Sequence, residues 1–259
     1  MTTLLAKNIT KSFGGVKAIQ DFSFELPEHD ICSIIGPNGA GKTTAFNLLT
    51  GVYPLDAGEV YLDGKPIHGK GQHEITRAGI ARTFQNIRLF KGLNVLENVM
   101  TAADPYSEYN LLDVIFASRR KRAREKAVEE EAREYLSIVG LPGMEQEKPE
   151  SLPYGMQRKL EVARALATKP KILLLDEPAA GLNPSEVRDF IALIRNLHAK
   201  FSFSILIIEH RMEVVMELSS HIFVLNFGKL LASGTPQEVR ANKEVTAAYI
   251  GEEDESCSV

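Results

Sequence analysis

The sequence predicts an α/β fold built on a mostly parallel sheet, with an antiparallel β subdomain and a helical insertion. Three observations carry this prediction. Apolar runs suited to buried strands alternate with helical patterns over residues 31–51 and 172–250, as in a parallel sheet flanked by helices. Short β patterns broken by turns fill residues 1–30 and 55–75. Strand patterns disappear over residues 89–168, where helical patterns replace them.

A glycine-rich stretch marks the expected ligand site. Residues 36–44 read G-P-N-G-A-G-K-T-T, which fits the P-loop pattern G-x-x-x-x-G-K-[ST]. The apolar run Ile31–Ile35 precedes it, and the helical pattern Lys42–Thr50 follows it. A strand, a glycine-rich turn and a helix N-terminus together surround a phosphate with backbone N–H groups and positive potential. The predicted phosphate cradle comprises Gly36, Pro37, Asn38, Gly39, Ala40, Gly41, Lys42, Thr43 and Thr44.

Two side chains of this loop have distinct expected roles. Lys42 is placed to reach the β- and γ-phosphates of a nucleotide, and the Thr43 hydroxyl is placed to ligate Mg²⁺. The motif therefore predicts a site for a nucleoside triphosphate and its magnesium ion.

Antiparallel β structure is predicted on both sides of the P-loop. Phe22, Phe24 and Leu26 alternate with polar residues, which is the pattern of a half-buried strand. The strand-like run Val60–Leu62 leads into Asp63–Gly64, a dipeptide typical of tight hairpins. These two regions can form one small antiparallel sheet packed on the phosphate-binding core.

The remaining elements follow in order along the chain. We expect helices at 94–100 and 118–139, strands at 172–175, 204–208 and 222–225, and helices that begin at Asn183 and Thr235. Each of these two residues is a good helix cap, followed by a proline at the first helical position and a glutamate at the third. Residues 252–259 form an acidic tail that we expect to fray.

Polar side chains follow several of the predicted strands. Asp176 and Glu177 come directly after the buried run 172–175, His210 follows the strand at 205–208, and Gln85 follows residues 81–84. In open α/β sheets, ligands bind outside the carboxyl ends of the strands, so we expect these side chains to lie near the P-loop. Asp176 would then bind Mg²⁺, and Glu177 would orient or deprotonate the water that attacks the γ-phosphate. Taken without the P-loop, a polar strand end that meets solvent is the alternative interpretation of such a pair.

The composition excludes several classes of protein. The 259 residues are 44% hydrophobic, which is enough for a substantial core, and the formal net charge of −4 offers no basic field for nucleic acid. Two cysteines, Cys32 and Cys257, do not make a disulfide framework and suit a reducing cytosol. The sequence shows neither a signal-peptide pattern nor an apolar run of the ~18 residues that a membrane span needs. We therefore expect a soluble chain whose membrane role comes from a partner.

A basic run at residues 119–124 reads R-R-K-R-A-R. Glutamates at 125 and 129–131 follow it, so we interpret the run as a solvated helix face. Contact with lipid headgroups near a membrane partner is the alternative.

Taken together, these motifs resemble the ATP-binding subunit of ABC transporters over almost the whole chain. The P-loop, Gln85, the segment L-P-Y-G-M-Q at 152–157, the D-E-P strand end at 176–178 and His210 occur in the family's order. Within the family, the sequence looks most like the Liv-type importers of branched-chain amino acids. The pointers are R-T-F-Q-N at 82–86, L-P-Y-G at 152–155, D-E-P-A-A-G-L-N-P at 176–184 and A-Y-I-G at 248–251.

The resemblance implies a role for each matching residue in the chain's own site. Phe13 matches the aromatic residue that stacks on adenine, although a plain core phenylalanine is the alternative. Gln85 would sense Mg²⁺ or the attacking water, and His210 would contact the γ-phosphate. The implied catalytic set is Glu177, His210, Gln85 and Lys42, and the implied metal set is Thr43, Gln85 and Asp176.

The resemblance also implies that part of the chain binds the nucleotide of a second subunit. The segment at 152–157 would lie at a helix N-terminus and bind the partner's γ-phosphate through backbone N–H groups. Asn183 would fall in the loop that touches the opposite subunit. The implied set in trans comprises Leu152, Pro153, Tyr154, Gly155, Met156 and Asn183.

This chain departs from the family's pattern in that segment. Pro153 stands in place of the usual serine, Tyr154 in place of a glycine, and Met156 in place of a glutamine that is found next to it as Gln157. Pro153 removes a hydroxyl and an N–H donor, so the γ-phosphate must rely on Gly155 and neighbouring backbone groups. Asn183 and Arg211 stand where aspartates are common, and no catalytic group is lost.

The sequence therefore leads to one expectation for the whole chain. Residues 1–88 and 169–251 would form a nucleotide-binding α/β core with its β subdomain, residues 89–168 a helical subdomain, and residues 252–259 a tail, all within one ABC ATPase domain. The resemblance implies an ATP-hydrolysing, Mg²⁺-dependent subunit of a branched-chain amino-acid importer at the cytoplasmic face of the plasma membrane. Its implied partners are a second ATP-binding subunit, which is a copy or a relative, integral membrane permease subunits and, indirectly, an external binding protein, with no role for nucleic acid.

Other readings stay open at this point. Importers of urea or short amides and the lipopolysaccharide-transport ATPase are similar in the core, so the cargo rests on the resemblance alone. A non-transport ABC ATPase is a rival, although the single cassette and the lack of a long coiled coil speak against it. A regulatory module that binds nucleotide without turnover is a third, which the presence of Lys42, Asp176, Glu177 and His210 disfavours.

Overall fold

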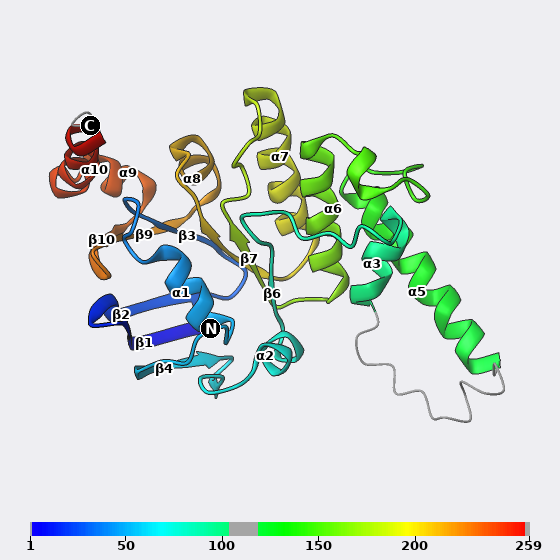
Figure 1. Cartoon of the computed structure of the whole chain (residues 1–259), viewed down its shortest axis with the longest axis horizontal. Coiled ribbons are helices and arrows are strands. Elements are labelled where there is room, and N and C mark those ends of the chain that lie inside the picture. The colour runs from blue at the N-terminus through cyan, green and yellow to red at the C-terminus, as the bar shows by residue number, and fades with distance from the viewer. Residues whose placement is uncertain (1, 104–118, 257–259) are drawn as a thin grey trace. The chain divides into compact units, whose positions relative to one another are not determined.

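The computed structural model describes residues 2–103 and 119–256, and it has the expected α/β architecture (Figure 1). The chain divides into two compact units. The core unit comprises Met1–Gln85 and Lys171–Val259, and the helical unit comprises Asn86–Pro170. The core unit holds both β-sheets, and the described helical unit consists of helices and loops.

A six-stranded sheet forms the centre of the core unit, with the strand order β10-β9-β3-β8-β7-β6. The strands are β3 (Ile31–Ile35), β6 (Ile80–Arg82), β7 (Ile172–Asp176), β8 (Ser204–Ile208), β9 (His221–Asn226) and β10 (Lys229–Gly234). Neighbouring strands are parallel except for the β9–β10 hairpin at one edge. Every residue of β3, β7 and β8 is buried, because both faces of these central strands are covered.

The two faces of this sheet pack into different cores, since side chains along a strand point alternately to opposite faces. On one face, Cys32 and Ile34 of β3 pack with α1 (Lys42–Leu49) and with the antiparallel sheet. On the other face, Ile35 packs with the helices near the C-terminus. These helices are α8 (Met212–Leu218), α9 (Pro236–Ala241) and α10 (Lys243–Ser256), and α7 (Pro184–Lys200) packs beside α8.

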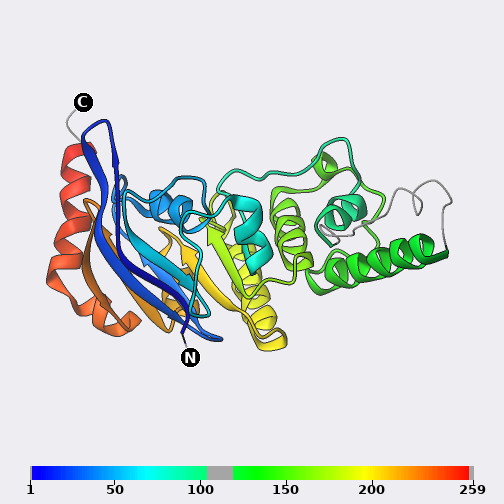
Figure 2. The ribbon, with the colours of Figure 1, turned by 90° about the horizontal axis from the view of Figure 1, so that it is seen from below.

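The antiparallel sheet confirms the second part of the fold prediction. Its strands are β1 (Thr2–Phe13), β2 (Val16–Pro27), β4 (Ala57–Leu62) and β5 (Lys65–Pro66), in the order β2-β1-β4-β5. The long β1–β2 hairpin is the dark-blue ribbon of Figure 2. Phe22, Phe24 and Leu26 are buried as their alternation predicts, and Asp63–Gly64 connects β4 to β5. The short helix α2 (Gln72–Ala78) was not foreseen.

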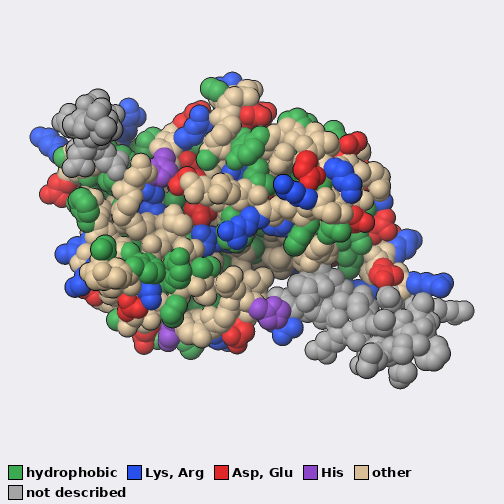
Figure 3. Space-filling view, viewed as in Figure 1, with side chains coloured by type: hydrophobic (Ala, Val, Ile, Leu, Met, Phe, Trp, Pro, Cys, Tyr) green, Lys and Arg blue, Asp and Glu red, His purple; other side chains and the backbone are tan. Residues whose placement is uncertain are grey.

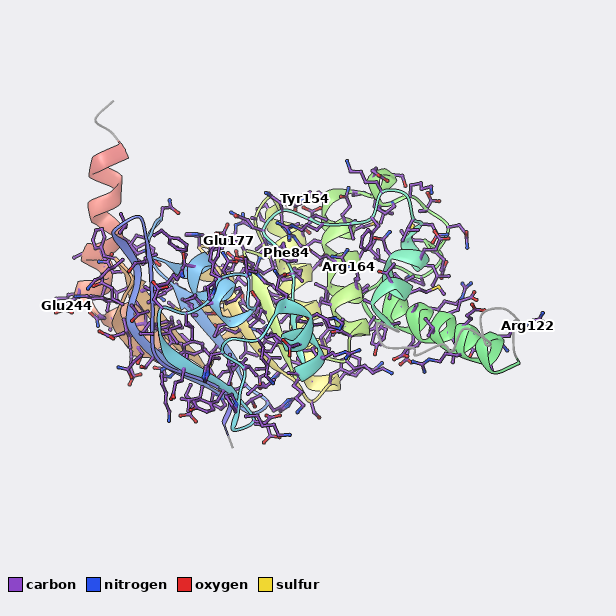
Figure 4. The ribbon with its side chains drawn as sticks, turned by 60° about the horizontal axis from the view of Figure 1, so that its bottom comes forward. Phe84, Arg122, Tyr154, Arg164, Glu177 and Glu244 are labelled. Carbon is purple, nitrogen blue, oxygen red and sulfur yellow. The ribbon has the colours of Figure 1, made fainter. Side chains whose placement is uncertain are left out.

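The helical unit contains helices that pack on one another. They are α3 (Val95–Ala103), α5 (Arg119–Ile138), the 3₁₀ turn η1 (Pro149–Ser151) and α6 (Tyr154–Ala167). In the described part of the basic run, the Arg122 and Arg124 side chains are exposed. Figure 4 shows Arg122 near the start of α5. Farther along α5, lysine and arginine pair with glutamates one turn away, as expected for a solvated face.

The first part of the acidic tail is helical, because α10 continues to Ser256. Asn242 caps this helix by accepting hydrogen bonds from the backbone N–H groups of Glu244 at 2.9 Å and Val245 at 3.4 Å. Once a helix has a stable start, each further residue adds one hydrogen bond, and glutamate is a good helix former. Residues 257–259 lie outside the described structure.

The described surface carries acidic and basic side chains interspersed on the face seen in Figure 3, in line with the modest net charge of −4. Over residues 2–103 and 119–256, none of the helices combines the length and apolarity needed to cross a membrane.

Burial predicts that Cys32 is chemically inert in the folded chain. Its thiol is fully buried in β3, and this burial raises the pKa of the Cys32 thiol to about 12, so the reactive thiolate is scarce near pH 8. Mass spectrometry after iodoacetamide treatment at pH 8 should find Cys32 unmodified in the native protein and alkylated in denaturant. Rapid native alkylation of Cys32 would contradict the packing described here.

Candidate functional site

The P-loop joins the end of β3 to the start of α1 and leaves no room for a side chain at its first residue. Gly36 has φ +149°, and a Cβ atom there would lie 2.0 Å from the backbone oxygen of Leu225 in β9. Helix α1 begins with no side-chain cap and no acidic residue in its first turn. The first N–H groups of an α-helix lack intrahelical partners, so this end of α1 suits a bound anion.

Lys42 lies inside the loop to which it belongs. Its ammonium donates to the backbone oxygens of Gly36 and Pro37, both at 2.7 Å, and the residue is only 5% exposed. Thr43, the next residue, is exposed. The loop therefore holds a positive charge close to backbone N–H groups, which is the environment that a polyphosphate requires.

Asp176 is anchored by an arginine whose role the sequence did not indicate. Arg82, the last residue of β6, donates to Asp176 Oδ2 at 2.7 Å, and both side chains are almost fully buried. The same guanidinium donates to Asn47 Oδ1 and Thr50 Oγ1 of α1 and its cap. It also lies 5.5 Å from the ring centroid of Phe46. Arg82 thus ties the end of β7 to the helix that follows the P-loop.

Glu177 is held between two other predicted site residues. Gln85 Nε2 donates to Glu177 Oε2 at 2.7 Å, and His210 Nε2 lies 3.1 Å from Glu177 Oε1. The backbone N–H of Glu177 donates to Ile208 O at 2.8 Å, which seats the residue beside the end of β8. Figure 4 shows Glu177 at this edge of the sheet, with Phe84 on the neighbouring segment. The core unit therefore brings Gln85, Glu177 and His210 together.

Glu209 is a second residue that sequence reasoning missed. It follows β8 directly and is 2% exposed. Its carboxylate accepts hydrogen bonds from the backbone N–H groups of Ala179, His210 and Arg211 at 2.7, 2.9 and 3.1 Å. Burial raises the pKa of the Glu209 carboxyl, and these hydrogen bonds act in the opposite direction. In the sequence, only its position next to His210 could have indicated that Glu209 belongs to the site.

Phe13 lies at the end of β1 and is 41% exposed, so it is not a core phenylalanine in this chain. Its ring meets Tyr53 edge-on, with centroids 5.1 Å apart, and Lys11 Nζ lies 5.6 Å from its centroid. An exposed aromatic face next to a basic group suits a nucleobase.

The segment at 152–157 begins α6 in the helical unit. Pro153 is the N-cap residue, and its oxygen accepts from the N–H groups of Met156 and Gln157 at 2.9 and 3.0 Å. The Gln157 side chain donates to Leu152 O at 2.9 Å, which closes the turn. Gly155 is half-buried. The first N–H groups of α6 therefore lie at an end without a side-chain cap.

The Tyr154 hydroxyl accepts a hydrogen bond from Arg158, which belongs to a buried ion pair. Arg158 donates to the Tyr154 hydroxyl at 2.9 Å and to Glu161 Oε2 at 3.0 Å, and the Arg158 and Glu161 side chains are 0% and 1% exposed. Tyr154 itself is 42% exposed at the start of α6, where Figure 4 shows it. An aromatic side chain thus lies at the N-terminus of α6, next to Gly155.

Asn183 serves as the N-cap of α7 in the core unit. Its side chain accepts from Ser185 N and Glu186 N, and Glu186 accepts from Asn183 N, which confirms the predicted helix start.

The oxygen donors of the core unit fit a magnesium ion. The predicted set offers the Thr43 hydroxyl, the Asp176 carboxylate and the Gln85 amide, and hard cations prefer such oxygen ligands. Among the described residues, no group of three histidine, cysteine or acidic side chains could hold a metal. The donor set therefore fits an ion that takes much of its coordination from phosphates and water, as Mg²⁺ commonly does.

Comparison with known proteins gives two family matches. Residues 19–180 match the model for ABC transporters, and residues 229–255 match the model for branched-chain amino acid ATP-binding cassette transporters. The high-affinity branched-chain amino acid transport ATP-binding protein BraF of Pseudomonas aeruginosa is 44% identical, with 96% of this chain and 98% of the relative aligned. The corresponding Escherichia coli protein LivG is 40% identical over the same shares.

Solved structures agree with these relatives. An ATP-binding cassette of an ABC transporter in its ADP conformation superimposes with a TM-score of 0.84 at 34% identity, covering 97% of this chain and 99% of the other. A dimeric cassette in a post-hydrolysis state, bound to ADP and Pi, has a TM-score of 0.76 at 25% identity, with 90% of this chain and 98% of the other covered.

Replacement of Gly36 by alanine should abolish nucleotide binding, because the added Cβ would collide with Leu225 O. Gly64→Ala, in the β4–β5 turn outside the P-loop, is the matched control: no heavy atom lies within 4 Å of its Cβ position, and its φ of +73° costs only about 1–2 kcal/mol for alanine. Titration with a fluorescent ATP analogue should show at least a roughly 10-fold larger Kd for Gly36→Ala than for Gly64→Ala. Equal affinities would contradict the close approach to β9.

Proposed function

This chain belongs to the ABC transporter family of ATP-binding proteins, and on that basis we propose that it is the ATP-hydrolysing subunit of an importer for branched-chain amino acids. The observation that carries the proposal is the Glu177 carboxylate, held between Gln85 and His210 at the end of β7. These groups lie in the same unit, and on the same central sheet, as the P-loop.

The proposed chemistry rests on positioning and charge stabilisation. Lys42 and the N–H groups at the start of α1 bind the β- and γ-phosphates, and Phe13 offers its ring to adenine. Glu177 orients the attacking water and accepts its proton, while His210 contacts the γ-phosphate. Magnesium, held by Thr43, Asp176 and Gln85, would neutralise charge on the phosphates.

We further propose that a second ATP-binding subunit completes each site. The N-terminus of α6, with residues 152–156, would bind the γ-phosphate held by the partner chain, and Asn183 would contact that chain. Two facts support this arrangement: α6 begins without a side-chain cap, and a related cassette has been solved as a dimer bound to ADP and Pi. Two nucleotides between two chains give a closed, two-fold assembly.

The proposed cargo and location follow from the relatives. BraF and LivG are named as high-affinity branched-chain amino acid transport proteins, and the match at residues 229–255 is to a model of the same transport class. We propose that permease subunits anchor this chain at the cytoplasmic face of the plasma membrane and that a binding protein outside delivers the amino acid.

Glu177→Gln should leave ATP binding intact and reduce hydrolysis by about 10²-fold or more, because the amide cannot accept the proton of the attacking water. Phosphate release and analogue binding are measured on the same preparation. The control Glu217→Gln makes the same chemical change in α8, where the carboxylate is exposed and pairs with Arg195. Near-normal ATP turnover by Glu177→Gln would contradict the role assigned to Glu177.

The cargo is tested in proteoliposomes that contain this chain, the matching membrane subunits and the binding protein. Leucine, isoleucine or valine should stimulate ATP turnover and accumulate inside, and Glu177→Gln complexes should show no uptake. Stimulation by urea or a short amide, but by none of the three amino acids, would reject the cargo while leaving the ATPase assignment in place.

A further inference from the structure

The Glu209 carboxylate is buried at the centre of the catalytic edge, yet it takes no part in the proposed chemistry. It is 2% exposed and follows β8, whose last residue, Ile208, is fully buried. A buried carboxylate is costly unless hydrogen bonds compensate for the lost water. Backbone N–H groups of two neighbouring turns supply that compensation.

Both oxygens of Glu209 are engaged, and they engage different segments. Oε1 accepts from the Ala179 N–H at 2.7 Å, on the turn that follows β7. Oε2 accepts from the His210 and Arg211 N–H groups at 2.9 and 3.1 Å, on the turn that follows β8. One side chain therefore joins two turns that lie 30 residues apart in sequence.

Each of these turns carries a residue of the proposed reaction. On the first, Ala180 N donates to Glu177 O at 3.1 Å, so the anchored Ala179 lies within the turn that Glu177 opens. Glu177 has φ +46°, a left-handed conformation that a glutamate keeps only when its surroundings impose it. On the second, the bond to Glu209 holds the backbone of His210 while its ring reaches Glu177 Oε1 at 3.1 Å.

We propose that Glu209 is a positioning residue for ATP hydrolysis. Its carboxylate fixes the turn of Glu177 relative to the turn of His210, so that these two side chains stay in contact. This inference rests on the roles proposed above for Glu177 and His210. In this proposal Glu209 acts through those two residues and not by contact with the substrate. Because the Ala179 turn continues to Asn183, the same carboxylate also links the hydrolytic edge to the proposed subunit contact.

The substitution Glu209→Gln tests this link without changing the size of the side chain. Both oxygens accept hydrogen bonds, so an amide must turn its NH₂ group towards at least one backbone N–H, and one of the two turns is released. A displacement of about 1 Å at a reacting group can cost 10²-fold in rate, so kcat should fall roughly 10- to 100-fold. The KM for ATP and the Kd of an ATP analogue should stay within about 3-fold, because the P-loop is unchanged.

A double-variant comparison with His210 distinguishes a positioning role of Glu209 from a purely structural one. If Glu209 acts partly through His210, the double variant Glu209→Gln/His210→Ala should lose less activity than the product of the two single losses. Glu217→Gln, the exposed control on α8, should behave as wild type. A kcat for Glu209→Gln within 2-fold of wild type, a loss shared equally by kcat and nucleotide affinity, or fully multiplicative losses would each overturn the proposal.

Two further measurements keep the outcome unambiguous. If Glu209→Gln does not fold, Glu209→Asp retains the charge but shortens the reach, and it should show the same fall in kcat at unchanged analogue affinity. Hydrolysis by Glu177→Gln is measured in parallel. Normal turnover there would reject the proposed catalytic site, whereas an inactive Glu177→Gln beside a fully active Glu209→Gln would reject only the positioning role.

Discussion

The parallel register of β3, β8 and β7 is the constraint on which the site depends. In this register Ile34 of β3 pairs with Ile208 of β8, and Ile208 pairs with Asp176 of β7, so the three strands end in one row. Glu209 and Glu177 follow this row directly, and the P-loop follows Ile35, the one residue by which β3 extends beyond it. A shift of one residue in any strand would turn its side chains to the opposite face and take the next functional group away from the edge.

Burial makes this register strict. All the residues of these three strands are buried, and the two faces of β3 contact different partners, the antiparallel sheet with α1 on one side and the C-terminal helices on the other. A slipped strand would exchange residues between two cores of different shape, which close packing does not tolerate. The closely packed apolar interior thus fixes the positions of the polar groups at the sheet edge.

Local patterns in the sequence predicted most of the fold and part of the site. The P-loop, the strand end at Asp176 and the cap at Asn183 depend on neighbours within a few residues, so their signals lie in short stretches. The bond between Arg82 and Asp176, 94 positions apart, and that between Glu209 and Ala179 depend on which strands become neighbours, which no local pattern encodes. Helix α2 was missed for another reason: only Ile75 is buried along it, so the helix has no apolar repeat.

The left-handed backbone of Glu177 has a consequence for how such a chain can change over generations. Glu177, the residue to which we assign the attacking water, occupies a conformation that glycine or asparagine adopts more easily, so the proposed catalytic position is also one where the fold is below its optimum. The proposed activity therefore favours glutamate at this position, whereas the stability of the fold favours glycine or asparagine. A duplicate released from the need to turn over ATP could gain stability by giving up the acid, and inactive descendants would then tend to be sturdier than their working parent.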